Sequence, residues 1–330
     1  MQGDETHYES ATSGPRAQGN QSRQYERSEG LIVRHEDINY SILMTFVAVH
    51  AVTAYALWSV GFEWKYLTWT LGLYCFRWLG FTCSVHRYFS HRVFRTSRWF
   101  QGLLGVWATL TMARSPIRFA SGHRHHHIYS DTKRDLHSPK ELGLGGAYLG
   151  WVISKRYHED VLGRVSDLRR YPELVVLNKF YFVPNLLFLY LLYMVGGGVA
   201  LTYGGLVSVI VIWHVAFSVT VIFHVYGRAT YETYDRSRNS NLLGFLTFGE
   251  GWHNNHHANM SSARLGHEPW QVDLGFLFLS ALEKAGLIWD LNRSVGARSY
   301  GASKKLRLSH QAAACVDFGY TEASVNSHAA

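Results

Sequence analysis

Long apolar runs alternate with polar stretches along the chain, and four of these runs are long enough to cross a bilayer as helices. A helix needs about 20 mainly apolar residues to span the hydrocarbon core. The Gly-rich stretch 196–205 predicts the turn before the last run, and Pro184, which lacks a backbone N–H, predicts a kink in the third. The pattern thus predicts an all-α integral membrane protein with spans at about 40–60, 66–85, 180–199 and 206–226.

Basic residues predict the orientation of these spans. Lys and Arg gather before the first span, between residues 87 and 179, and after residue 228, whereas the turns inside each pair of spans carry almost none. Loops rich in Lys and Arg stay on the cytosolic side of a membrane. We therefore expect a multi-pass protein with both termini and the long central loop in the cytosol.

The polar ends and the shorter apolar segments complete the expected organisation. Residues 1–33 are rich in Gln, Ser, Gly, Arg and Glu without apolar periodicity, which predicts a disordered tail. A membrane domain is expected over 34–292, followed by a second disordered tail over 293–330. Shorter apolar segments inside the domain predict interfacial or cap helices at 99–112, 148–152 and 274–288.

Composition supports a membrane protein and limits the partners. Of 330 residues, 47% are hydrophobic and only 17% are charged, below the quarter typical of soluble domains. The mean hydropathy of −0.08 averages polar tails with apolar spans. The net charge of +8 suits an anionic membrane surface or acidic partners. Nucleic-acid binding is not favoured, because the basic residues flank spans and form no separate module.

Nineteen histidines are present, and nine of them form a pattern. They occur in HRYFSH, GHRHHH, GEGWHNNHH and IFHVYG. In each HxxHH motif the residues stand at i, i+3 and i+4, so the three imidazoles share one helix face. The candidate ligands are His86, His91, His123, His126, His127, His224, His253, His256 and His257.

The number of these histidines predicts a centre with two metal ions. Nine imidazoles are too many for one tetrahedral zinc ion and fit two ions of higher coordination. Imidazole binds zinc, copper, iron and nickel, so the ligand type leaves the metal open. His86 and His91 are five apart, about 140° around an α-helix, so one of them should lie at a helix end. Glu250, Asp131 and Asp135 are expected to fix the imidazole tautomers.

The remaining histidines are expected outside the centre. His50 and His267 have no partner at ligand spacing, and His125 points off the face of its motif. His214 precedes His224 by ten residues and is expected to be structural. His137 is open between a structural role and contact with a ligand.

These motifs resemble those of the membrane-bound fatty acyl desaturases of the Δ9 type, in the bacterial and plant branch of acyl-CoA and acyl-lipid enzymes. The resemblance covers about residues 34–292 and rests on HRHHHIYSDTKRDLHSP, SRNSNLLGFLTFGEGW, GEGWHNNHHA and SARLG. It implies four transmembrane helices with a cytosolic helical cap that holds a His-rich di-iron site, with the nine histidines as ligands of two Fe ions (Fe²⁺/Fe³⁺).

The resemblance also implies roles for further residues. Thr220 stands where the family usually has an Asn that holds a metal-bound water. Asp135, Glu250 and Asn254 are expected around the ligands. Thr70 and Tyr74, three to four turns before His86, are expected at the end of an acyl tunnel.

The implied reaction is the O₂-dependent introduction of a cis double bond, at Δ9, into a saturated acyl chain carried by CoA, acyl carrier protein or a lipid. Ser121 and Gly122 replace the Arg-Asp pair that serves CoA binding in the animal enzymes, which argues against CoA. An external donor, a ferredoxin or cytochrome b5 with its reductase, should supply electrons, since the chain shows no fused cytochrome b5 and no GxGxxG motif. Membrane lipid is a further expected partner.

Two other functions remain open from the residues. A fatty acyl hydroxylase, or another di-iron oxidation, would use the same scaffold and differ only in its product. A His-rich membrane protein that binds or transports metal is the more remote alternative. Transport needs ionisable groups along a path through the spans, whereas these histidines gather at the cytosolic ends.

Overall fold

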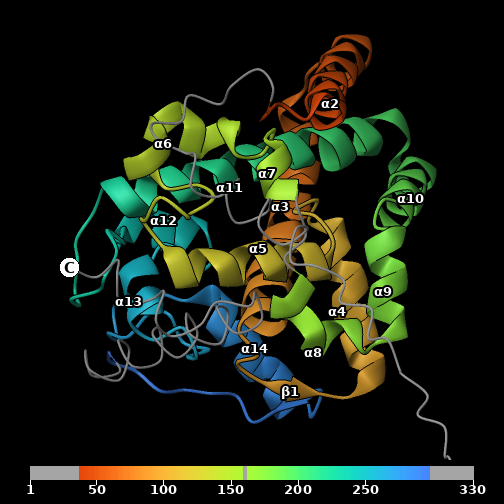
Figure 1. The fold of residues 1–330 in the computed structure, drawn as a ribbon. Coiled ribbons are helices and arrows are strands. Elements are labelled where there is room, and N and C mark those ends of the chain that lie inside the picture. Colours follow the sequence, from red (N-terminus) through yellow and green to blue (C-terminus); the bar gives the residue numbers. More distant parts are fainter. Residues whose placement is uncertain (1–36, 159–161, 298–330) are drawn as a thin grey trace, which may run out of the picture.

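The computed structural model describes residues 37–158 and 162–297, and this part of the chain is predominantly helical (Figure 1). The predicted N-terminal tail at 1–33 and most of the predicted C-terminal tail lie outside the described residues. Of the latter, Arg293 and Gly296 are bonded to the body of the protein, to Ser280 and His267.

The elements follow one another in two groups along the chain. The first group comprises α2 (Tyr40–Val60), η2 (Trp64–Tyr66), α3 (Leu67–Gly80), η3 (Phe81–Ser90), β1 (Arg95–Thr96), α4 (Arg98–Leu110), α5 (Pro116–Tyr129), α6 (Pro139–Gly145), η4 (Gly146–Gly150) and α7 (Lys155–His158). The second comprises η5 (Leu162–Val165), α8 (Ser166–Arg169), α9 (Pro172–Lys179), α10 (Val183–Val199), η6 (Ala200–Val207), α11 (Ser208–Val225), α12 (Asn241–Leu246), α13 (His253–Ala258), α14 (Leu274–Lys284) and β2 (Ile288–Trp289).

Two helical stretches are long and apolar enough to cross a membrane, Tyr40–Val60 and Val183–Val225. The first is α2, and Asn39 caps its N-terminus with a side chain that accepts a hydrogen bond from Ile42 N at 3.3 Å. It ends at Gly61, whose φ of 76° is a conformation that glycine adopts without strain. A helix that is apolar on all sides needs an apolar environment all round, and most side chains of α2 are exposed in the protein alone.

The second stretch contains a chain reversal much shorter than the predicted turn at 196–205. Gly196 and Gly197 leave helical geometry, with φ 60° and ψ −152° at Gly197. Helix resumes at once, and residues 200–207 form η6, a π-helix. η6 packs back onto α10, where a Cβ at Gly205 would lie 2.7 Å from Leu189 Cδ2. The glycines of η6 therefore allow close helix packing and do not form the turn.

Pro184 does not kink a helix, contrary to the expectation from its sequence position. Helix α10 begins at Val183, so Pro184 lies in its first turn. The first backbone N–H groups of a helix have no partner within the helix, so a proline there removes no hydrogen bond. Residues 180–182, expected inside the third span, precede the helix.

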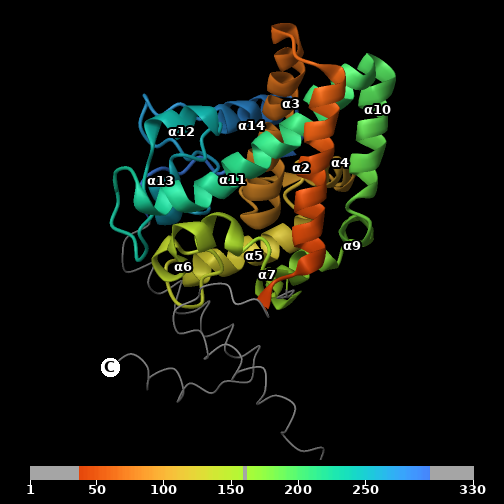
Figure 2. The same cartoon turned by 90° about the horizontal axis from the view of Figure 1, so that it is seen from above.

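Three of the helices, α2, α3 and α10, run roughly parallel, and α11 crosses from them toward α13 (Figure 2). α3 continues without interruption into the π-helix η3, so this helical stretch reaches Ser90, beyond the predicted limit at residue 85. Buried side chains of η3, α4, α5, α9 and α14 form the main apolar core, which contains Phe89, Leu104 and Leu174.

The predicted cap helix at 274–288 is shorter than expected. α14 ends at Lys284, and Ile288 lies in a two-residue strand opposite Thr96. Asp273 is the N-cap of α14, and its side chain accepts a hydrogen bond from Phe276 N at 2.9 Å. The predicted segment at 99–112 corresponds to α4, and that at 148–152 overlaps η4.

Candidate metal centre

All nine predicted histidines converge, and they divide into a group of five and a group of four. Within each group the nearest ring nitrogens lie within 4.8 Å of one another. We call these the first and the second histidine group. The first contains His86, His91, His123, His127 and His256, and the second contains His126, His224, His253 and His257.

The π-helix η3 explains how His86 and His91 reach one group despite their spacing of five. In a π-helix the hydrogen bonds join residues i and i+5, and His91 N donates to His86 O at 3.2 Å. The two residues therefore lie on one face of the helix, and their rings meet edge to face with centroids 4.9 Å apart. His91 ends the helix, as expected for one member of the pair, but the helix type was not foreseen.

In the first group, ring nitrogens of neighbouring imidazoles face each other. Nε2 of His123 lies 2.8 Å from Nε2 of His91 and 3.0 Å from that of His127. His256 Nε2 lies 3.1 Å from His86 Nε2 and 3.0 Å from His127 Nε2. Helices α5 and α13 and the end of η3 thus direct five nitrogen atoms to one point.

In the second group, the histidine at the end of α11 meets those of α5 and α13. His224 Nε2 lies 3.2 Å from His253 Nε2. The rings of His126 and His257 are 5.3 Å apart, and their Nε2 atoms are buried without a hydrogen-bond partner. His126 and His127 are adjacent in sequence but serve different groups, so α5 contributes to both.

Four carboxylates lie against the outward ring nitrogens. Nδ1 of His126 contacts Asp135 at 3.0 Å, and Nδ1 of His224 contacts Asp131 at 2.8 Å. Since a carboxylate only accepts hydrogen bonds, each contacted Nδ1 carries the proton, and the Nε2 lone pair faces the group. Two further contacts of this kind join His86 to Glu250 at 2.6 Å and His257 to Asp235 at 2.7 Å.

Asp235 and Arg87 are the contributors that sequence reasoning missed. Arg87 is buried, 2.8 Å from Asp273 and 3.7 Å from Glu250, so it compensates the charge of the acid that contacts His86. Its position directly after His86 was the only available signal. Asp235 lies 18 residues before His253, where no spacing rule points to it.

The residue before Glu250 is a glycine because the Asp273 side chain lies directly against its backbone. Gly249 has φ 113°, and a Cβ there would lie 2.3 Å from Asp273 Oδ1. Only glycine fits such a site without moving its neighbours. This turn brings Glu250 beneath His86, where the Thr82 hydroxyl also donates to it.

Burial favours the neutral form of three ligand candidates in the first group. Removal from water, reinforced by neighbouring imidazoles, lowers the pKa of His123, His127 and His256 well below the ordinary imidazole value. Burial alone would raise the pKa of Asp131, but the hydrogen bond that it accepts from His224 lowers the pKa to about 2. Neutral imidazoles beside ionised carboxylates are the forms that bind a metal.

Two of the expected neighbours of the ligands have other contacts. The Thr220 hydroxyl lies 2.6 Å from Ala147 O and 2.8 Å from Phe217 O, so its single proton serves a backbone carbonyl. Asn254 Oδ1 accepts from Thr230 N and Tyr231 N, both at 2.7 Å. The Asn254 side chain therefore fixes the loop that carries Asp235, through hydrogen bonds to Thr230 and Tyr231.

The other histidines near the motifs are placed as follows. His125 contacts Arg134 O and the guanidinium of Arg164, outside both groups, as expected. The His137 ring packs 4.3 Å from that of His126, with its Nδ1 3.9 Å from Asp135. His137 thus supports the second group.

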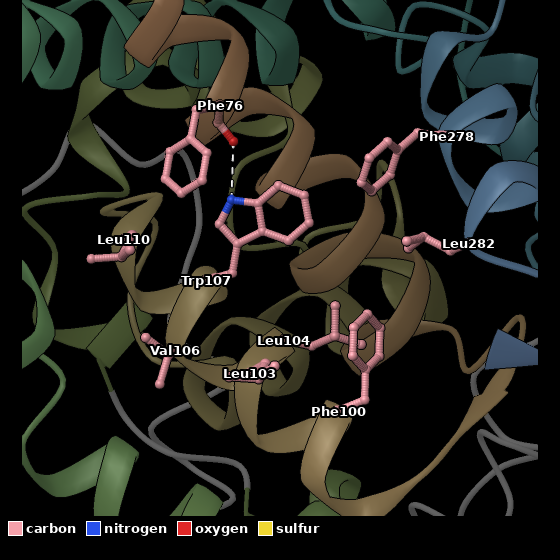
Figure 3. A pocket seen from close by; sticks show the side chains of 9 residues that line it. All are labelled: Phe76, Phe100, Leu103, Leu104, Val106, Trp107, Leu110, Phe278 and Leu282. Atoms are coloured by element: carbon pink, nitrogen blue, oxygen red, sulfur yellow. Dashed lines mark hydrogen bonds between the residues drawn. The ribbon is translucent and has the colours of Figure 1, made fainter. Parts of the chain in front are cut away.

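Thr70 and Tyr74 both make hydrogen bonds to other elements. Thr70 donates to Tyr203 O at 2.9 Å, and Tyr74 donates to Leu246 O at 2.8 Å and stacks on Trp78. An apolar pocket of about 360 Å³ lies elsewhere, between α3, α4 and α14 (Figure 3). None of the predicted tunnel residues or histidine ligands lines this pocket, whose wall includes Phe76, Trp107 and Phe278.

Comparison with known proteins agrees with this arrangement. The model of the fatty acid desaturase family matches residues 62–265, which include all nine histidines. The chain belongs to the fatty acid desaturase family. It is therefore an enzyme, an oxidoreductase of fatty acyl chains, and the resemblance seen in the sequence is confirmed.

Its relatives include plant and cyanobacterial enzymes. Delta-9 acyl-lipid desaturase 1 of Arabidopsis thaliana is 38% identical over 70% of this chain and 76% of its own. The sn-1 stearoyl-lipid 9-desaturase of Anabaena variabilis is 35% identical over 76% of this chain and 92% of its own. The hex-5-enoyl-[acyl-carrier protein] acetylenase of Moorena producens is 30% identical over 80% of this chain and 87% of its own.

Proposed function

We propose that this desaturase binds two iron ions through its nine histidines and uses O₂ to introduce a cis Δ9 double bond into a saturated acyl chain. The observation that carries the proposal is the division of the histidines into two neighbouring groups of five and four. The groups supply five and four nitrogen ligands, which fits one ion of five or six coordination in each group with positions left for oxygen ligands.

The residues of both groups fit such ions. His126 Nε2 and His257 Nε2 are buried without a hydrogen-bond partner, which is costly unless another group binds them. Facing imidazole nitrogens at 2.8–3.2 Å repel each other when both carry lone pairs, and a cation between them relieves this. The four carboxylates fix the tautomers and supply negative charge.

The overall reaction states what the protein must arrange. A saturated –CH₂–CH₂– unit, O₂, two electrons and two protons give a –CH=CH– unit and two water molecules. Bound iron would supply the O₂ chemistry that breaks two unactivated C–H bonds. The chain's own residues hold the metal ligands rigidly, exclude water and position one carbon pair of the acyl chain.

A lipid-linked acyl chain is the proposed substrate. Two of the relatives are named as acyl-lipid or stearoyl-lipid desaturases, and one is named for an acyl chain carried on acyl carrier protein. Ser121 and Gly122, in α5, replace the charged pair expected of a CoA enzyme. These observations favour a glycerolipid over acyl-CoA.

A basic surface above the second histidine group is the proposed docking site for the electron donor. The segments 131–140 and 228–238 direct Asp131, Asp135 and Asp235 inward to imidazoles. The same segments expose Lys133, Arg134, Lys140, Arg228 and Arg236, against one exposed acid, Glu232. Positive charge of this kind favours an acidic carrier such as a ferredoxin or cytochrome b5, with its reductase.

The connection from this surface to the second group is short. The backbone N–H of Arg236 donates to Asp131 Oδ2 at 2.7 Å, and the same oxygen contacts His224 Nδ1 at 2.8 Å. One carboxylate therefore separates a surface residue from a ligand candidate. An electron carrier seated on Arg236 would lie beside the centre.

We further propose four spans with both termini and the centre in the cytosol. α2, the stretch α3–η3, α10 and η6–α11 supply the four helices. The histidines lie at the ends of η3 and α11 and in the segments that follow them. Interface placement of the centre lets a lipid chain enter from the bilayer while a soluble donor approaches from the other side.

Fatty acid analysis tests the proposed function. The protein and its His256→Ala variant are produced in a host lacking Δ9 unsaturated acids, and the methyl esters are analysed by gas chromatography–mass spectrometry with double-bond location. A Δ9 monounsaturated acid is expected only with the unsubstituted protein. His125→Gln, a change on the same helix as three ligand candidates but outside both groups, is the control and should retain the product.

The products also separate the alternatives. A hydroxy acid would assign the protein to the hydroxylase alternative. No new product, together with fewer than two iron ions per purified chain, would contradict the di-iron proposal. Analysis of intact lipids, acyl-CoA and acyl carrier protein in the same cells identifies the carrier.

A further inference from the structure

Three polar side chains meet between α2, α11 and η4, away from the two histidine groups. His50 in α2 and His214 in α11 bring their Nε2 atoms to 3.1 Å. The Tyr148 hydroxyl of η4 lies 2.5 Å from His214 Nδ1. His50 Nδ1 lies 2.8 Å from Phe46 O in its own helix. Such groups inside membrane helices are rare and mark function more often than packing.

The contacts permit one arrangement of protons in which every group is neutral. Phe46 O only accepts, so His50 Nδ1 carries a proton and His50 Nε2 carries a lone pair. His214 Nε2 must then donate to His50, which leaves a lone pair on His214 Nδ1. Tyr148 donates to that lone pair. The hydrogen bonds therefore run in one direction, from Tyr148 through His214 to His50.

This chain of hydrogen bonds fastens the segment 146–154 to the membrane helices. Beside Tyr148, Ala147 O accepts from the Thr220 hydroxyl of α11 at 2.6 Å. At the other end of the segment, Ile153 O accepts from Asn39 N at 2.7 Å, directly before α2. The segment is thus bound both to α11 and to the start of α2.

The fastened segment carries the side chain that supports the second histidine group. The Trp151 ring packs 5.0 Å from the His137 ring. His137 in turn packs 4.3 Å from His126, a member of the second group. A contact path therefore runs from Tyr148 through the backbone to Trp151, His137 and His126.

We infer that Tyr148, His214 and His50 are positioning residues that hold Trp151 and His137 against His126 and so set the geometry of the second histidine group. The inference rests on the proposed di-iron function. It assigns a role to two histidines that sequence reasoning left as structural, and it predicts an effect on one metal ion and not on the other.

Unfolding of the metal-free protein tests whether the hydrogen bonds of Tyr148, His214 and His50 depend on one another. Tyr148→Phe, His50→Leu and the double variant are compared by thermal unfolding in detergent. Each single change should lower Tm by roughly 2–4 °C, the effect of one buried hydrogen bond in a chain of this size. Because both bonds depend on the tautomer of His214, the double variant should lose less than the sum. Additive losses of Tm would show that the two hydrogen bonds are independent and would contradict the inference.

Iron titration of the same variants tests the positioning role. In Tyr148→Phe the ferrous ion of the second histidine group should lose roughly tenfold in affinity, the lower end of effects from residues behind metal ligands, while the other ion is unchanged. Ser218→Ala is the matched control, since this hydroxyl bonds only within α11, to His214 O. Mössbauer spectra should change for one iron site only.

The outcomes are distinguishable from failure of the proposed function. A lower Tm for Tyr148→Phe with unchanged affinity for both ions would mean that these hydrogen bonds only stabilise the fold, and this result would overturn the inference. An unsubstituted protein that binds fewer than two ions would contradict the di-iron proposal. In that case the non-additive Tm losses of the Tyr148 and His50 variants would still test whether the three side chains are linked by hydrogen bonds.

Discussion

Asp235 Oδ2 accepts a hydrogen bond from His257 Nδ1 at 2.7 Å, and this contact joins the loop after α11 to the second histidine group. Asp235 is largely buried, which alone would raise its pKa, but its contact with the His257 ring holds the pKa well below the ordinary value. The carboxylate is therefore ionised at neutral pH and fixes the His257 tautomer.

Removal of this charge should weaken one metal site. Asp235→Asn keeps an oxygen near His257 but no charge, so we expect the affinity of the second group for ferrous iron to fall by roughly 10- to 100-fold. Iron titration of the purified protein measures this effect. Glu232→Gln, an exposed acid of the same loop, is the control. Equal affinities in Asp235→Asn and the unsubstituted protein would contradict the assigned role.

Tyr74 is expected to limit the length of the acyl chain. Tyr74→Ala removes the ring stacked on Trp78 and should admit a chain longer by two methylenes, with a relative kcat/KM gain of roughly tenfold or more. Product chain lengths by gas chromatography measure the change. Tyr74→Phe loses only the hydrogen bond to Leu246 O and should keep the original profile. An unchanged profile in Tyr74→Ala would show that the ring only packs.

Charge reversal at Arg236 tests the docking surface of the donor. The side chain of Arg236 is exposed, while its backbone N–H makes the bond to Asp131. Arg236→Glu should therefore leave the centre intact and slow electron transfer from an acidic donor roughly tenfold at low ionic strength. The difference should shrink as salt is added. Stopped-flow reduction measures the rate, and Arg95→Glu, at an exposed site on β1, is the control. A slower rate that salt does not affect would argue against docking.

His267 should make stability depend on pH. Burial, with the charge of Arg264, lowers the pKa of His267 to about 4, below the ordinary 6.5. Between these values His267 binds a proton in the unfolded chain but not in the folded protein. The free energy of unfolding is therefore highest above pH 6.5 and decreases as the pH falls toward 4. Thermal unfolding of His267→Gln should fall less steeply over this interval. Parallel curves for the two proteins would refute this assignment.

The histidine motifs predicted the centre because their spacing is local. In HxxHH the helix period alone places three imidazoles on one face, and α5 and α13 carry His123 to His127 and His253 to His257 in this way. The sequence could not assign ligands to two groups, since His126 and His127 are adjacent and yet separate. Their division depends on how α5 packs against η3 and on where the end of α11 places His224 beside His126.

Long-range contacts account for what the sequence missed. Asp235 lies in a loop without periodicity, and its partner is 22 residues away. Tyr148 and His214 are 66 residues apart, and His50 and His214 are 164 apart. No spacing rule connects such residues, because tertiary packing alone brings them together. Pro184 and the glycines after residue 197 were misassigned because both residue types fit helix starts or close packing as well as kinks and turns.

The π-helix before His91 also requires a fixed number of residues between His86 and His91. A π-helix holds more residues per turn than an α-helix, so deletion of one residue between His86 and His91 would let η3 relax to the commoner α-helical form. The two histidines would then be four apart and could still share a face, but every residue after them would shift by one. Phe89 and Phe94, buried in the core, would lose their present positions. Natural variation by insertion or deletion should therefore be absent from this turn, even where single substitutions are tolerated.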